Sequence, residues 1–490
     1  MLFNSWDFLF LLAATLLLYY IPRSSKGWQV SLLLVASAVF YGWNDPRLLI
    51  LLLASCVFNT VAVERILHRK ARGENDRARS WLIAAVAINL GFLAFFKYAG
   101  FMVAMLPDGW LSPVIREWFV GIPLPIGISF YTFQGVSLIV DVWRNQISEN
   151  TATALAGRGM RRVASLRDTS FYISFFPQLV AGPIVKAHEF IDQIGTKRFR
   201  AIDWKTARRA LITGYFLKIF VADNLAEQTA ALSSGGLALA ERSVIDLIAL
   251  LYGYSFQIFA DFAGYSLIAI GLAALFGYQL PENFRFPYLS CSITEFWKRW
   301  HLSLSSWLRD YLYIPLGGNR AGTGRTYFNL FLVMFLGGLW HGAAWKFALW
   351  GSLHGLFLAI ERFITRRTGK TGTPTTVLPV WRALLGWALT FHLVTLLWLT
   401  FMMPDLASIS AFFEGVSSLR PGLTGPPLFS LLFYGSMIAL YHFWGWLTEH
   451  RAQLAGRAAS SSLEPLAHGL MLFLILTNPG PPAGFIYFQF

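Results

Sequence analysis

The chain has 490 residues, of which 56% are hydrophobic and only 13% are charged, with a net charge of +14. Soluble domains carry about a quarter charged residues, so this composition excludes a water-soluble globule, and it also excludes a disordered chain. Two cysteines, Cys56 and Cys291, cannot supply a disulfide scaffold. The composition predicts an all-α, polytopic membrane protein, and no aromatic and basic module for binding nucleic acid is present.

Hydrophobic runs in chain order leave room for about 10–12 transmembrane helices, since each crossing takes about 20 residues. The segment from Met1 to Tyr20 contains Asp7, lacks a basic n-region and has no small-residue cleavage site before the next apolar run, so it is predicted to be a membrane helix and not a signal peptide. The run 243–279 is too long for one straight helix and contains Gly253, Asp261, Gly264 and Gly271, so we expect one crossing plus a broken or re-entrant piece. Membrane runs are predicted at 8–21, 28–43, 48–63, 81–106, 118–142, 209–224, 243–279, 327–341, 343–361, 383–403, 428–447 and 465–478.

The basic residues give an orientation for these helices. With the N-terminus outside, the inner segments hold most lysines and arginines, whereas the outer loops hold only Arg47, Arg116, Arg242 and Arg420. This asymmetry follows the positive-inside rule. It predicts a multi-pass protein with both termini outside, which is the periplasm if the cell is Gram-negative.

Two stretches, 144–208 and 280–326, are too polar to span a membrane and too apolar for exposed loops. Irregular backbone survives at membrane depth only when it is buried in protein or lines a wet cavity. We therefore expect both stretches to be partly inserted at the inner face, as re-entrant and interfacial helices. No internal repeat or low-complexity linker is present, so residues 1–490 are predicted to form a single domain.

Ionisable residues in membrane runs are candidate functional groups. His341 is flanked by Gly337, Gly338 and Gly342, which let backbone or a ligand come close. The spacing alone leaves open whether this histidine is catalytic or a buried residue in a tight helix-packing corner. The remaining histidines except His301 are predicted to be solvated or to pack between helices: His68, His188, His354, His392, His442, His450 and His468.

His301 lies in a segment that predicts one amphipathic helix, which Ser290, Ser292 or Thr294 caps and Pro315 helps to end. Its aromatic and apolar residues share one helical face: Trp297, Trp300, His301, Leu304, Trp307, Leu308 and Tyr311. An interfacial helix with aromatic anchors explains this pattern. A site for a polyanionic substrate explains it as well, because Lys298, Arg299 and Arg309 could bind phosphates.

Other catalytic chemistries have little support in this sequence. Cys56 lies in an apolar run without a nearby base. No metal site is predicted, because neither an HExxH pattern nor paired cysteines occur. No Gly-x-Ser-x-Gly elbow is present, although a Ser-His-Asp triad stays open.

Several motifs together resemble the membrane-bound O-acyltransferase family, in its bacterial polysaccharide O-acetyltransferase branch. The similarity is most marked over about 120–360, and teichoic-acid D-alanyl transferases are more distantly similar. The matching segments are Met-Leu-Phe-Asn-Ser5, Phe176-Pro-Gln-Leu-Val-Ala-Gly-Pro183, Asp261-Phe-Ala-Gly-Tyr265, Pro281-Glu-Asn-Phe-Arg-Phe-Pro-Tyr288, Glu295-Phe-Trp-Lys-Arg-Trp-His-Leu-Ser303 and Leu339-Trp-His-Gly342.

The resemblance implies a helical shell around a central tunnel that links a cytoplasmic donor site to an outer funnel. It implies that His341 is the catalytic histidine and that His301 is a second one, replaced by Asn in some branches. Trp340, Asp261 and Asn283 lie within the matching motifs and are further substrate-binding candidates.

The last residues, Phe485-Ile-Tyr-Phe-Gln-Phe490, follow a stretch rich in proline and glycine. An aromatic anchor in the outer interface explains the ending of this tail, 479–490. The ending is also similar to the C-terminus of the small partner peptide of D-alanylation systems, in which a tyrosine is proposed to carry the acyl group. This similarity implies that Tyr487 accepts the acyl group.

The expected function is transfer of an acetyl group from cytoplasmic acetyl-CoA, a co-substrate, for O-acetylation of an exopolysaccharide such as alginate; no tightly bound cofactor is expected. A neutral histidine suits the general base, because its pKa lies near neutrality. The expected partners are a periplasmic esterase-like acetyltransferase, an exopolysaccharide biosynthesis complex and membrane lipids. The alternatives are a transporter or flippase of an acyl donor or glycan, and a non-catalytic scaffold of a polysaccharide-secretion complex.

Overall fold

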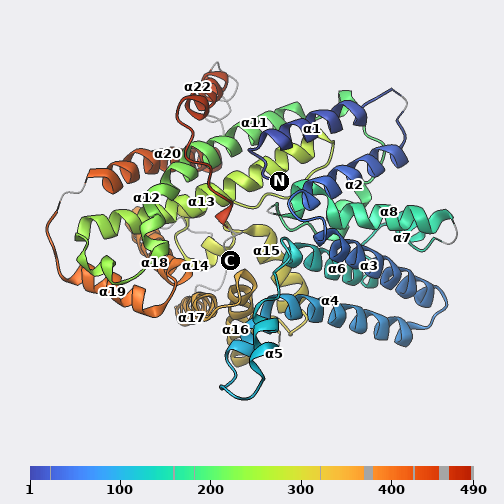
Figure 1. Ribbon diagram of the computed structural model, residues 1–490, viewed down its shortest axis with the longest axis horizontal. Coiled ribbons are helices and arrows are strands. Elements are labelled where there is room, and N and C mark those ends of the chain that lie inside the picture. The colour runs from blue at the N-terminus through green and yellow to red at the C-terminus, as the bar shows by residue number, and fades with distance from the viewer. Residues whose placement is uncertain are drawn as a thin grey trace. The chain divides into compact units, whose positions relative to one another are not determined.

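The computed structural model describes residues 1–490 except 23, 158–159, 181, 321, 369–378, 423–424, 452–462 and 487–490. The described residues form helices and no strand (Figure 1), which confirms the all-α prediction. The chain divides into two compact units, one made of Met1–Leu211 and Ile268–Pro281 and the other of Ile212–Leu267 and Glu282–Phe490. The expectation of a single domain stays a prediction.

The first unit is a helical bundle in which α3 packs against α4, α6 and α8. Tyr172 and Phe175, which belong to the stretch 144–208, are fully buried in this unit. The predicted run 118–142 is wrong as one helix, because Pro123 and Pro125 lack N–H donors and separate α5 from α6. The unit contains α1 (Trp6–Tyr19), α2 (Lys26–Gly42), α3 (Leu48–Ala71), α4 (Asn75–Ala104), α5 (Pro113–Val120), α6 (Ile128–Trp143), α7 (Glu149–Leu155), α8 (Met160–Ser174), α9 (Phe176–Leu179), α10 (Ala187–Phe190), η1 (Ile191–Gln193) and η2 (Phe199–Ala201).

The second unit holds both candidate histidines, and α16 packs along α17 in it. Two helices, α11 (Trp204–Tyr215) and α13 (Val244–Leu275), contribute residues to both units. The other helices of the second unit are η3 (Phe216–Ala222), α12 (Asp223–Ser234), η4 (Leu237–Glu241), η5 (Pro287–Leu289), α14 (Ile293–Trp297), α15 (Leu302–Leu308), η6 (Arg309–Tyr313), α16 (Thr323–His341), α17 (Trp345–Arg367), α18 (Val380–Met402), α19 (Leu406–Ser417), α20 (Gly425–His450) and α22 (Leu463–Thr477).

Helix α13 corrects the expectation of a broken or re-entrant piece within 243–279. It is one helix of 32 residues, and its glycines serve packing instead of breaking the helix. A Cβ added to Gly264 would lie 2.9 Å from the carbonyl oxygen of Gly214 and 2.9 Å from the backbone nitrogen of Lys218. Glycine therefore lets η3 pack directly against the backbone of α13.

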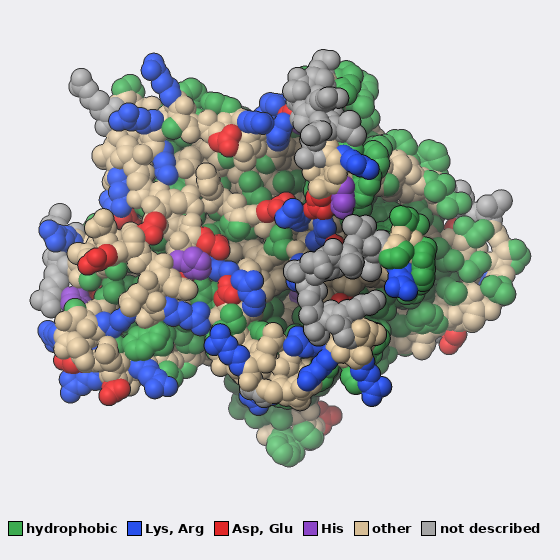
Figure 2. All heavy atoms as spheres, turned by 180° about the vertical axis from the view of Figure 1, so that it is seen from behind, with side chains coloured by type: hydrophobic (Ala, Val, Ile, Leu, Met, Phe, Trp, Pro, Cys, Tyr) green, Lys and Arg blue, Asp and Glu red, His purple; other side chains and the backbone are tan. Residues whose placement is uncertain are grey.

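Six described helices are long and apolar enough to cross a membrane: α3, α4, α13, α17, α18 and α20. Shorter apolar helices are α1, α19 and α22. Many hydrophobic side chains are exposed on the molecular surface (Figure 2). Examples are Trp6, Ile50, Phe429 and Leu476, which are 78%, 68%, 70% and 80% exposed. Such surface is stable against lipid and costly in water, which supports a multi-pass membrane protein.

Candidate active site

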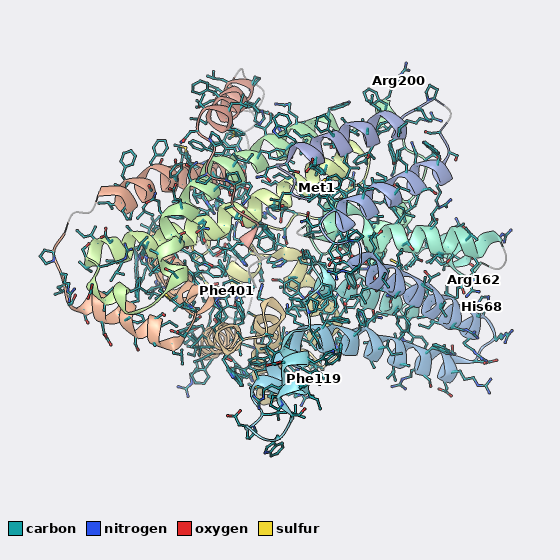
Figure 3. All side chains as sticks on the ribbon, viewed as in Figure 1. Met1, His68, Phe119, Arg162, Arg200 and Phe401 are labelled. Atoms are coloured by element: carbon teal, nitrogen blue, oxygen red, sulfur yellow. The ribbon has the colours of Figure 1, made fainter. Side chains whose placement is uncertain are left out.

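His341 is the last residue of α16 and is enclosed by aromatic rings. The ring centroids of Trp340, Trp350 and Phe401 lie 5.1, 5.3 and 5.3 Å from that of His341. Phe401 projects from α18 and is labelled in Figure 3. The imidazole is 5% exposed, so aromatic packing from three helices fixes its orientation.

The glycines around His341 provide the close approach that the sequence predicted, and the partner is the backbone of α17. A Cβ on Gly338 would lie 2.3 Å from the Phe347 carbonyl oxygen and 2.9 Å from the Cα of Gly351. A Cβ on Gly342 would lie 2.1 Å from the ring of Phe347. The two helices are therefore in backbone contact at the end that carries the histidine.

His301 lies in a break between two short helices, so the predicted single helix across 295–311 is wrong. Ser292 caps α14 as expected, since its side chain accepts a hydrogen bond from the Glu295 N–H. The chain then leaves α14, and His301 adopts φ +46°, in the left-handed region, directly before α15. A left-handed conformation at a non-glycine residue is costly and persists only when surrounding contacts enforce it.

Asn283 makes several of the contacts that hold His301 in this conformation. Its side-chain oxygen accepts hydrogen bonds from His301 Nδ1 at 3.1 Å and from the Ser303 hydroxyl at 2.8 Å. Its backbone oxygen accepts the Leu302 N–H at 2.9 Å, and its amide nitrogen donates to Ser266 Oγ at 3.0 Å. Because the amide oxygen can only accept, the neutral His301 ring carries its proton on Nδ1 and its lone pair on Nε2.

The two histidines, forty positions apart in the sequence, are neighbours in the second unit. Their ring centroids lie 6.4 Å apart, and the Trp340 ring lies 5.9 Å from His301 and 5.1 Å from His341. Burial lowers the pKa of His301 to about 3, so its imidazole is neutral at neutral pH. Two imidazoles in a dry aromatic shell can accept and return a proton.

The three predicted phosphate-binding cations differ in their surroundings. Lys298 is exposed and makes no ion pair in the described part of the chain. Arg299 binds Glu295 Oε1 at 2.9 Å and both carboxylate oxygens of Glu449 at 3.0 Å. Arg309 binds Asp310 at 2.7 Å. Arg299 would have to give up these carboxylates to bind a phosphate, which leaves Lys298 as the more accessible cation.

Asp261 lies on α13 in a buried ionic cluster that the sequence analysis missed. Lys218 Nζ lies 2.7 Å from Asp261 Oδ1 and 2.7 Å from Asp223 Oδ1. Asp261 Oδ2 also accepts the N–H of Ile486 at 2.7 Å, so this carboxylate contacts the C-terminal tail. The sequence contained one signal for this cluster: Lys218 lies within the predicted membrane run 209–224, where a lysine needs a counter-ion. Asp261, in the run 243–279, was a candidate for that counter-ion. Tyr487 itself lies outside the described residues.

The other chemistry-bearing groups lie apart from this pair of histidines. His354, His392 and His442 bond Trp297, Tyr252 and the Ile438 carbonyl, respectively. The first unit contains a basic hollow of about 320 Å³, two of whose lining residues, His68 and Arg162, are labelled in Figure 3. Among the described residues, no group of three or more His, Cys, Asp or Glu side chains could hold a metal ion.

Comparisons with known proteins show the family of the chain. The sequence profile of the membrane-bound O-acyltransferase family matches residues 142–404. The chain is 38% identical to a probable alginate O-acetylase of Pseudomonas aeruginosa over 96% of this chain and 86% of the relative. It is 34% identical to the peptidoglycan O-acetyltransferase of Helicobacter pylori, over 81% and 75%, and 28% identical to the teichoic acid D-alanyltransferase of Bacillus subtilis, over 62% and 79%.

The apolar helices and the matches to known acyltransferases define a multi-pass membrane enzyme that transfers acyl groups. The chain belongs to the membrane-bound O-acyltransferase family. The predicted enzyme class is therefore confirmed over the transporter and the scaffold. The central tunnel and the roles of the individual site residues stay predictions.

Proposed function

We propose that the protein takes an acetyl group from acetyl-CoA at the cytoplasmic side of a bacterial inner membrane and transfers it for O-acetylation of an exopolysaccharide such as alginate. Relatives named as a probable alginate O-acetylase and a peptidoglycan O-acetyltransferase support the acetyl group and a glycan acceptor. The observation that carries the proposal is the pair of buried imidazoles 6.4 Å apart. In this proposal both termini are periplasmic, and membrane lipids surround the helices.

His341 acts as the general base. Its neutral imidazole takes the proton of an acceptor hydroxyl while the oxygen of that hydroxyl attacks the thioester carbonyl carbon. The carbon–sulfur bond then breaks, and the CoA thiolate takes the proton back from the imidazolium. The products are an acetyl ester and free CoA thiol, and no oxidant or reductant is needed.

His301 orients the reacting groups and supplies a lone pair at Nε2, because Asn283 holds its Nδ1 as a donor. Trp340 contacts both rings and shields them from water. Exclusion of water favours transfer to a hydroxyl over hydrolysis of the thioester. Lys298, with Arg309, binds the phosphates of the donor through charge-assisted hydrogen bonds.

Tyr487 is the first acceptor in this scheme. Support comes from the described end of the tail: the Phe485 ring lies 5.7 Å from the Phe262 ring, which lies 4.6 Å from the His301 ring. Two successive ring contacts, which we call the aromatic path, therefore connect the described end of the tail to His301. An aryl ester on a tyrosine remains activated, so a periplasmic esterase-like partner in an exopolysaccharide biosynthesis complex can pass the acetyl group to the polymer.

The test uses the purified full-length protein with acetyl-CoA that is radiolabelled in its acetyl group. We expect His341→Ala to reduce thioester consumption by about 10²- to 10⁴-fold, the usual contribution of a general base. Tyr487→Phe should abolish label retained on the protein. His392→Ala, which removes an exposed imidazole of the same unit, is the control and should behave as wild type.

Unchanged thioester consumption in His341→Ala would refute the role of this base. Label that persists in Tyr487→Phe would refute the tyrosine carrier and leave the acetyltransferase activity standing. The two parts of the proposal therefore fail separately.

A further inference from the structure

The C-terminal segment that follows α22 is bound along η3, α12 and α13 through its backbone. In Figure 1 this segment can be followed in red from α22 to α13. Four hydrogen bonds hold it: Asn224 Nδ2 to the Asn478 oxygen (3.2 Å), the Gly480 N–H to the Ile219 oxygen (3.1 Å), Lys218 Nζ to the Ala483 oxygen (3.0 Å) and the Ile486 N–H to Asp261 Oδ2 (2.7 Å).

The ionic cluster of Lys218, Asp223 and Asp261 shares two hydrogen bonds with this segment. Lys218, Asp223 and Asp261 are 2%, 2% and 3% exposed, and buried charges are costly unless all their hydrogen bonds are made. The Lys218 ammonium group donates hydrogen bonds to Asp223 Oδ1 at 2.7 Å and to the Ala483 carbonyl oxygen at 3.0 Å, and it forms an ion pair with Asp261 Oδ1 at 2.7 Å. The Ile486 N–H supplies a donor to the carboxylate oxygen of Asp261 that Lys218 does not use.

Two side-chain features make the binding selective for this segment. The Phe485 ring is fully buried, 4.4 Å from the ring of Tyr265 and 5.7 Å from that of Phe262. Gly480 lies so close to α12 that an added Cβ would be 2.4 Å from the Asn224 nitrogen. A side chain at position 480 would therefore clash with α12, and position 485 favours a large aromatic side chain.

We propose that Lys218 and Asp261 form a docking site for the chain's own C-terminal segment, 478–486. They are positioning residues, because they bind the tail backbone and act on the reaction only through it. The docking site holds the chain end beside the aromatic path to His301. This last consequence rests on the proposed function, in which Tyr487, the residue after Ile486, receives the acetyl group.

Docking is tested by digestion of the full-length protein in detergent with a carboxypeptidase that removes aromatic C-terminal residues, followed by intact-mass measurement. In the wild type, trimming should stall at about residue 486, where the backbone is bound. Asp261→Asn replaces the carboxylate, which accepts the Ile486 N–H and pairs with Lys218, with a neutral amide. The amide binds the Ile486 N–H more weakly, so trimming past 486 should be about tenfold faster. Asp223→Asn, which keeps both tail contacts, is the matched control and should stall as the wild type does.

A second pair of variants leaves the buried charges untouched. Gly480→Ala forces the tail away from α12 and should also speed trimming about tenfold, whereas Gly484→Ala has open space around its added Cβ and should not. Equal trimming of the wild type, Asp261→Asn and Gly480→Ala would overturn the docking site, and so would equal trimming of Gly480→Ala and Gly484→Ala.

Radiolabelled acetyl-CoA separates this proposal from the tyrosine carrier. Asp261→Asn should reduce label on the protein about tenfold with an unchanged KM for acetyl-CoA, whereas general misfolding would change both. If the wild type carries no label while Asp261→Asn still releases the tail, the carrier fails and the docking site stands. If Asp261→Asn neither releases the tail nor loses label, the docking site fails and the carrier stands.

Discussion

The two histidines of the candidate site are held in place by different forces. His341 ends a regular helix, and aromatic rings and a glycine-mediated helix contact fix it. His301 lies in an irregular segment with a left-handed backbone, and hydrogen bonds to Asn283 fix it. Packing determines where a ring lies, whereas hydrogen bonds also determine which nitrogen carries the proton. His301 therefore has a fixed tautomer, whereas His341 has a fixed position.

Among variants that leave both histidines in place, the largest effect is expected from Asn283→Leu, which acts only on the His301 side. The substitution removes the oxygen that accepts from His301 Nδ1 and from the Ser303 backbone and hydroxyl, all of them buried. Each buried donor left without a partner costs about 1–3 kcal/mol. We expect acetyl transfer to fall about 100-fold, together with a lower melting temperature.

Asn283→Asp is the conservative control for that prediction, because it keeps an acceptor for His301 and Ser303 and loses only the donor to Ser266. It should recover most of the transfer rate, measured with labelled acetyl-CoA. Equal losses in both variants would mean that Asn283 acts through overall packing and not through the His301 proton.

A smaller effect is expected from Gly338→Ala, which acts on the His341 side. The added methyl group would meet the Phe347 carbonyl oxygen at 2.3 Å, so α16 and α17 have to separate. Overpacking of this kind costs about 1–3 kcal/mol. We expect a lower thermal melting temperature and a slower transfer step. Gly324→Ala, on the same helix with open space around its added Cβ, should leave both unchanged, and a similar loss there would contradict the packing argument.

The sequence predicted much of the His341 side of this comparison and little of the His301 side. Glycine spacing around His341 is a local signal, and it indicated a close approach before the approaching helix was known. A helical face through Trp297, His301 and Leu304 was an equally good pattern, but it was wrong. The side-chain oxygen of Asn283, which lies 18 residues before His301 and outside the helical pattern itself, bonds His301 and Ser303 and stabilises a break that the pattern does not contain.

The same limit applies to α13 and the tail. Asp261 was recognised as a candidate from a motif, but its partners Lys218 and Ile486 lie far from it in the sequence. Glycines within 243–279 were interpreted as breaks, because a glycine that weakens a helix and one that packs against another backbone look alike in sequence. Composition and periodicity therefore predicted the helices, and tertiary contacts decided how polar residues on them are used.

The smallest effect is expected from Lys298→Ala, because the Lys298 side chain lies on the surface and not among the rings around the two histidines. Its side chain is exposed and makes no ion pair in the described part of the chain, so its loss should leave the melting temperature unchanged. If it binds a donor phosphate, the KM for acetyl-CoA should rise a few-fold with little change in kcat, because one exposed charge-assisted contact adds uniform binding. Arg299→Ala provides the contrast: it breaks the pairs with Glu295 and Glu449 and should lower the melting temperature. A fall in kcat with an unchanged KM in Lys298→Ala would instead assign this lysine to the transfer step, and the donor phosphates would then have to bind elsewhere.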